Sequence, residues 1–74
     1  MGYVFTDPEN AADLAGYVLR RALAEGNLDE ARLIINDVER WRSNPREVEA
    51  HRIFMDKYGE EYRKAVELLA SHVG

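Results

Sequence analysis

Apolar residues recur at spacings of three and four through the first half of the chain. One stripe consists of Ala11, Leu14, Ala15, Val18 and Ala22, and a second consists of Leu28, Ala31, Ile35 and Val38. This spacing is typical of amphipathic helices, whose apolar side chains share one face. Because only two or three residues separate the two segments, the pattern predicts an antiparallel helical hairpin in which the stripes face each other.

Start and stop signals bound each predicted helix. A residue suited to cap a helix N-terminus is followed three positions later by Glu at three places, Thr6, Asn27 and Asn44. Pro8 and Pro45 stand near first helical positions, where a missing amide hydrogen costs little. Gly26 predicts the end of the first helix, since glycine readily adopts the left-handed conformation. These signals predict helices over about 8–25, 28–42 and 45–72.

The third segment is open to two interpretations. Val48, Met55, Tyr62 and Leu69 recur every seven residues, and this phase is kept across Gly59, which favours one continuous helix. Alternatively, Gly59 ends the helix and a fourth, short helix follows. A continuous helix would be about 42 Å long and would overhang the hairpin, with its stripe from Tyr62 to Val73 uncovered. We expect either a bend at Gly59 or a second subunit to cover that stripe.

The predicted fold class is therefore all-α, a small up-down bundle of three helices in one domain, residues 1–74, with the third helix kinked or split at Gly59. The short apolar segment Tyr3-Val4-Phe5 precedes the first cap. It is too short for an independent strand, and we expect it to pack on the bundle or to dock with a partner.

The hairpin resembles a tetratricopeptide repeat at its turn, Gly26-Asn27-Leu28-Asp29-Glu30-Ala31, and the resemblance spans about 34 residues from Ala12 to Pro45. Leu19 and Ala22 depart from the family, which prefers a small glycine and an aromatic residue at these positions. The resemblance implies the geometry of a helical hairpin. It does not imply a peptide-binding groove, because such a groove requires neighbouring repeats and no second copy follows.

The composition of the chain excludes several kinds of chemistry. The 74 residues include no cysteine, 46% are hydrophobic, 32% are charged, and the net charge is −4. The chain thus has neither disulfides nor thiol catalysis, and it lacks the overall positive charge of a protein whose whole surface attracts nucleic acid. No apolar run approaches the length of a membrane span or forms a signal peptide. We expect a cytoplasmic protein without membrane insertion.

Catalytic and metal-binding constellations are not evident. The hydroxyl-bearing residues Thr6, Ser43 and Ser71 lie at predicted caps, turns or helix ends, where structural roles explain them. On a continuous helix, His51 and His72 would be about 31 Å apart, too far to share an ion. Glu47 and His51 together offer only two ligands, which is too few for zinc. We therefore predict no enzyme activity, no bound metal and no cofactor.

Two segments stand out as candidate partner-binding surfaces. Arg40, Trp41, Arg42 and Arg46 place three arginines and the only tryptophan within seven residues. Tryptophan and arginine often dominate protein interfaces, and they also stack on nucleic-acid bases. The alternative is a Trp41 that closes the core beside solvated arginines. The second surface is an apolar arc wider than one packing seam requires, formed by Ile53, Phe54, Tyr58 and Tyr62.

These features predict a small helical protein–protein interaction module, acting as an adaptor, an inhibitor or a self-associating scaffold, with a homodimer favoured over another protein partner. One alternative is a designed helical protein without a biological role, suggested by three cap signals in one short chain; Gly16 and Gly59 within helical stretches speak against it. A second alternative is a small nucleic-acid-binding protein that uses the Arg40–Arg46 turn, which the net negative charge disfavours.

Overall fold

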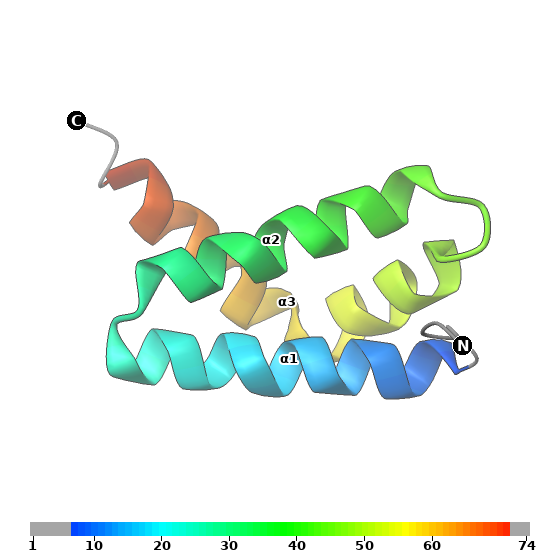
Figure 1. Ribbon diagram of the computed structural model, residues 1–74, viewed down its shortest axis with the longest axis horizontal. Helices are drawn as coiled ribbons and strands as arrows, with labels where there is room; N and C mark the ends of the chain where they lie inside the picture. The colour runs from blue at the N-terminus through cyan, green and yellow to red at the C-terminus, as the bar shows by residue number, and fades with distance from the viewer. Residues whose placement is uncertain (1–6, 72–74) are drawn as a thin grey trace, which may run out of the picture.

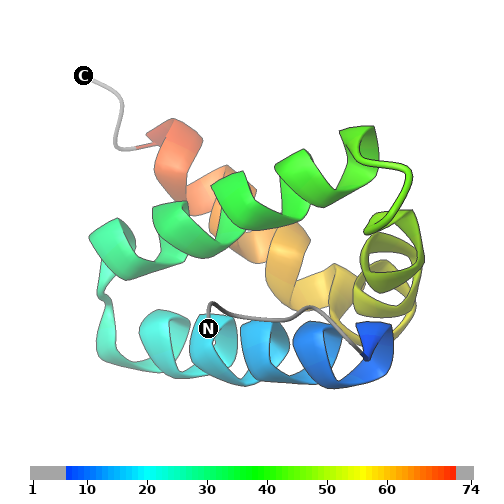
Figure 2. The same cartoon turned by 45° about the vertical axis from the view of Figure 1, so that its right-hand side comes forward.

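The computed structural model describes residues 7–71 and contains three helices, α1 (Pro8–Glu25), α2 (Leu28–Ser43) and α3 (Val48–Ser71). In Figure 1, α1 and α2 run antiparallel and α3 passes behind both of them. Figure 2, turned by 45°, shows the same arrangement. Each helix packs against the other two. The predicted all-α three-helix bundle is confirmed. No helix in residues 7–71 combines the length and the apolar character needed to cross a membrane.

The hairpin is bounded by local hydrogen bonds close to the predicted positions. The carboxylate of Asp7 accepts from the backbone N–H of Glu9 at 3.0 Å and from that of Asn10 at 3.4 Å, so Asp7 is the N-cap of α1. The prediction of Thr6 as this cap was wrong by one residue, because Asp7 directly precedes Pro8 at the first helical position. Gly26 ends α1 in the left-handed conformation, with φ 70°, as predicted.

The turn between α2 and α3 differs from the prediction. Asn27 caps α2 as expected, since its side chain accepts from the backbone N–H of Glu30 at 3.1 Å. Asn44 instead occupies a turn: its carbonyl accepts from the N–H of Glu47 at 2.9 Å, while its side chain accepts from the N–H of Arg46. Asn followed by Pro is a preferred start for a β-turn. The chain therefore reverses across residues 44–47, and α3 begins at Val48 instead of Pro45.

The third helix bends at Tyr58. Its backbone, with φ −124° and ψ 22°, leaves the helical region, whereas glycine φ is positive only at Gly26 among the described residues. The predicted kink is present, one residue before Gly59, and the second half continues without a separate fourth helix. The bend buries Ala65 completely and packs Tyr62 and Leu69 against the core. Val73 lies outside the described residues, as does the segment Tyr3-Val4-Phe5.

The core lies between all three helices, and its largest fully buried side chains are Phe54, Leu19 and Val38. On α2 the predicted stripe is buried at Ala31, Ile35 and Val38. On α1 the buried face instead comprises Ala12, Ala15, Gly16, Leu19 and Ala22. Leu14, predicted to face α2, is 67% exposed. The reason is that α1 packs against α2 and α3 together, so its buried face points between those two neighbours.

The seven-residue repeat does not predict the buried face of α3 in the first half of that helix. Val48 is 48% exposed, whereas Ala50 and Phe54, which lie off that stripe, are completely buried. A residue with non-helical dihedrals changes the angular phase of the side chains that follow it, so one repeat cannot describe both halves of a bent helix.

Exposed ion pairs join α3 to α1. The ammonium group of Lys57 lies 3.2 Å from the carboxylates of both Glu9 and Asp13. The side-chain hydrogen bond to Asp13, followed by that to Glu9, raises the pKa of Lys57 above its usual value. Further along, Arg20 pairs with Glu61 at 3.0 Å. Ion pairs of this kind contribute little to stability but help to fix the position of α3.

Candidate functional site

Four of the predicted partner-binding residues meet inside the bundle as an aromatic cluster. The ring centroid of Phe54 lies 6.4 Å from that of Trp41, 5.6 Å from that of Tyr58 and 6.1 Å from that of Tyr62. Phe54 is fully buried and Trp41 is 7% exposed. Edge-to-face pairs such as Trp41 with Phe54 are favourable ring arrangements. The structure thus places Trp41 in the core, which is the alternative to an exposed binding residue.

The two tyrosines of the cluster are also held by hydrogen bonds. The hydroxyl of Tyr58 donates to the carboxylate of Asp13 at 3.3 Å, and that of Tyr62 donates to the carboxylate of Glu39. Partial burial, and then this hydrogen bond, raise the pKa of Tyr62 to about 12. Because Asp13 belongs to α1 and Glu39 to α2, the tyrosines connect α3 to both neighbouring helices.

Two arginines of the predicted arginine-rich surface form ion pairs with carboxylates of their own helix. Arg40 lies 3.1 Å from Asp37 and Arg42 lies 3.5 Å from Glu39, each within α2. These carboxylates partly neutralise the two guanidinium groups. Arg46 is exposed in the turn before α3, and Ile53 is half-buried against the core. The eight predicted site residues therefore do not form one continuous surface.

An open groove lies between the first two helices, with a volume of about 360 Å³. This α1/α2 groove is lined by Ala11, Leu14, Ala15, Val18, Ile34, Asp37, Arg40, Trp41 and Glu47. Six of these nine side chains are apolar, and none belongs to α3. On α1 they follow the spacing that keeps residues on one helix face. Near the hairpin turn, Arg21 pairs with Glu30 at 3.4 Å and links the two helices.

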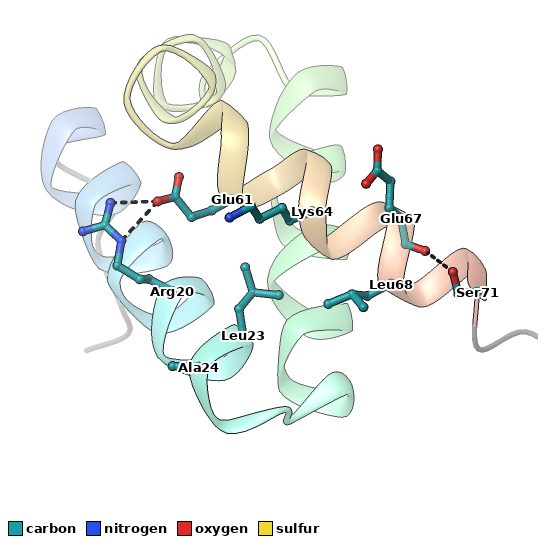
Figure 3. A pocket seen from close by; sticks show the side chains of 8 residues that line it. All are labelled: Arg20, Leu23, Ala24, Glu61, Lys64, Glu67, Leu68 and Ser71. Atoms are coloured by element: carbon teal, nitrogen blue, oxygen red, sulfur yellow. Dashed lines mark hydrogen bonds and ion pairs between the residues drawn. The ribbon is translucent and has the colours of Figure 1, made fainter.

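A second open groove, of about 650 Å³, lies between α1 and the C-terminal half of α3. This α1/α3 groove is lined by Arg20, Leu23, Ala24, Glu61, Lys64, Glu67, Leu68 and Ser71. Figure 3 shows Leu23 and Leu68 reaching into it from facing helices, and the pairing of Arg20 with Glu61 at one side. It is larger than the α1/α2 groove, and four of its eight lining residues are charged, against three of nine there.

No known protein family, curated protein or solved structure matches this chain. Within residues 7–71, no three side chains of metal-binding type come together. The α1/α2 and α1/α3 grooves both offer space to another molecule.

The sequence patterns did not single out the α1/α2 groove. The spacing predicts that Leu14 and Val18 face the core, but Leu14 is 67% exposed. On α2, Leu33 is 64% exposed and Ile34 lines the groove. One signal pointed to this face: Leu33, Ile34 and Ile35 are consecutive, and three consecutive helical residues cannot all face one neighbour.

Proposed function

We propose that this protein is a small, non-enzymatic protein–protein interaction module whose α1/α2 groove receives the apolar face of a helix from a partner. The observation that carries this proposal is the exposure of Leu14, at 67%, on the edge of an open and mostly apolar groove. Exposed apolar surface rimmed by polar groups is typical of interaction sites. Here Asp37, Arg40 and Glu47 supply the polar groups.

The shape of the groove supports a helix as the bound element. Ala11 and Ala15 are small and lie on the groove side of α1, so they allow the backbone of a partner helix to come close. Helices pack through side chains of one that enter the spaces between side chains of the other. A groove between two antiparallel helices therefore suits an amphipathic helix with apolar side chains at spacings of three and four.

The α1/α3 groove is less suited to an apolar partner. Its charged residues are Arg20, Glu61, Lys64 and Glu67. A partner helix covering them would remove these groups from water, which costs free energy unless each charge regains a partner. The nucleic-acid alternative also has less support, because Arg40 and Arg42 each face a carboxylate of their own helix.

The proposal is tested with Leu14→Glu and a matched control on the same helix. Tyr17 is 62% exposed but does not line the groove, so Tyr17→Glu adds the same charge elsewhere. Circular dichroism first verifies that both variants fold. We expect Leu14→Glu to abolish the binding of protein partners, or of the protein to itself, that wild type and Tyr17→Glu retain. The binding constants are measured by calorimetry with purified components.

Equal binding by wild type and Leu14→Glu would remove the α1/α2 groove from the proposal. Recovery of partners from an extract of the native host, followed by their identification, supplies the proteins for the calorimetry. Trp41 is a poor probe for this experiment because it belongs to the core, so its loss would alter folding and binding together.

A further inference from the structure

The α1/α2 groove carries a protruding side chain next to a recess, and we propose that its occupant is a second copy of this chain in a two-fold symmetric dimer. This inference rests on the proposed function, since it names the partner of the same groove. Leu14 protrudes with 67% of its surface exposed, and the alanines at positions 11 and 15 leave space beside it. In a two-fold dimer the same patch of both copies meets, so a protrusion beside a recess allows each copy to fill the recess of the other.

In such a dimer, the protruding leucine of each copy fills the recess of the other. Leu14 of each copy enters the groove of the other and packs among Ala15, Val18 and Ile34. Two-fold symmetry doubles every such contact, so each dimer buries two copies of Leu14. On α2, Leu33 lies one helical turn before the groove residue Asp37 and is 64% exposed.

The charges on the groove provide the second argument. Its lining contains two carboxylates and one guanidinium, from Asp37, Glu47 and Arg40. Arg40 forms an ion pair with Asp37, yet its side chain is 64% exposed, so its guanidinium can also pair with a second carboxylate. Glu47 forms no ion pair within residues 7–71. A two-fold axis through the groove pairs Arg40 of one copy with Glu47 of the other, in both directions.

The bend of α3 covers part of the apolar stripe that would otherwise compete for a second copy. A straight third helix would have left the stripe from Tyr62 onward for a second subunit. In the bent helix, Ala65 is buried and Tyr62 packs on the core, and Val66 is 40% exposed, less than the 67% of Leu14.

Sedimentation equilibrium measures the dimer directly. We expect wild type and Tyr17→Glu to dimerise at micromolar concentration, and Leu14→Glu to raise the dissociation constant at least about tenfold, as loss of a central apolar contact does. All three proteins are first compared by circular dichroism, so that loss of folding is not mistaken for loss of the dimer.

Exchanging the charges of Arg40 and Glu47 then tests whether the α1/α2 groove forms the dimer interface and whether that interface is two-fold symmetric. Arg40→Glu places two carboxylates opposite each other at both symmetric contacts, and Glu47→Arg places two guanidinium groups there. We expect each variant alone to be monomeric. Mixed in equal amounts, they should form a heterodimer, because both contacts then join opposite charges. The double variant, with both substitutions in one chain, should regain the homodimer.

Three results would overturn the inference. One is a wild-type protein that stays monomeric at high micromolar concentration. Another is a mixture of Arg40→Glu and Glu47→Arg that forms no heterodimer although both fold. The third is a dimer that appears only after removal of residues 1–5, which would assign the groove to the N-terminal segment of the same chain. A different protein bound by wild type and lost with Leu14→Glu would meanwhile preserve the proposed function.

Discussion

The ring of Tyr58 lies directly against the backbone of Gly16. A Cβ atom at Gly16 would overlap with Cγ, Cδ2 and Cε2 of this ring. The ring is held in place by its contact with Phe54, by a hydrogen bond from its hydroxyl to Asp13, and by the guanidinium of Arg20, 5.2 Å from its centroid. Since α3 bends at Tyr58, the missing side chain on α1 allows the third helix to approach closely at its bend.

Gly16→Ala should therefore destabilise the protein, although alanine is the better helix former. The added methyl group meets Cγ and one edge of the Tyr58 ring, which can move away only if the side chain rotates out of its contacts with Phe54 and Asp13 or the backbone shifts. We expect a loss of about 1–3 kcal/mol, typical of overpacking a filled site. Urea denaturation followed by circular dichroism measures it. An unchanged or higher unfolding midpoint would show that the ring has room to shift.

Gly59→Ala should have the opposite effect. A Cβ atom at Gly59 meets nothing within 4 Å, and its φ is not positive. Alanine restricts the unfolded chain and favours the helix, so we expect a gain of up to about 1 kcal/mol. The same denaturation experiment serves as its test, with Gly16→Ala as the contrasting variant. A loss of stability would mean that the bend at Tyr58 requires the flexibility of the glycine beside it.

The sequence predicts the helix ends of this fold better than the position of its bend. The ends of α1 and the start of α2 follow from local signals, because Gly26 and Asn27 act through hydrogen bonds to nearby residues. The position of the bend does not, since it depends on a close approach between Gly16 and Tyr58, 42 positions apart. Local signals therefore predict the kink at Gly59, one residue after its position at Tyr58.

Trp41→Ala should largely unfold the chain. Trp41 is 7% exposed and packs edge-to-face against Phe54. Removal of a buried tryptophan side chain costs about 3–5 kcal/mol, comparable with the entire stability expected of so small a core. Trp41→Phe keeps a ring at this site and should remain folded. Thermal unfolding followed by circular dichroism distinguishes the two variants; a cooperative transition for Trp41→Ala near that of wild type would place Trp41 outside the core.

The candidate site was harder to predict than the helices. Composition drew attention to Trp41 and its neighbouring arginines, yet Trp41 is buried and Leu14 is exposed. Spacing along α1 identifies an apolar arc, but the part of that arc that is covered depends on where α3 lies. That position depends on contacts between distant residues, such as the packing of Tyr58 on Gly16. Periodicity alone therefore could not separate the core face of α1 from its groove face.

Because Tyr62 is partly buried and donates a hydrogen bond to Glu39, we expect the protein to lose stability in alkali. Partial burial and the neighbouring carboxylate raise the pKa of Tyr62 to about 12 in the folded protein, against about 10 in the unfolded chain. The stabilisation is fully present below pH 10, and it is lost as the pH rises from 10 through 12, because the unfolded chain releases this proton first. Since Tyr62 is only partly buried, we expect a contribution on the order of 1 kcal/mol.

Tyr62→Phe removes this titration and Tyr17→Phe serves as its control, since Tyr17 is exposed. The free energy of unfolding, measured in urea at several values between pH 8 and about pH 12, should fall less steeply for Tyr62→Phe than for wild type or Tyr17→Phe. Below pH 10, Tyr62→Phe should be somewhat less stable than wild type, because Glu39 loses a hydrogen-bond donor. Parallel curves for all three proteins would show that the Tyr62 hydroxyl does not distinguish the folded from the unfolded state.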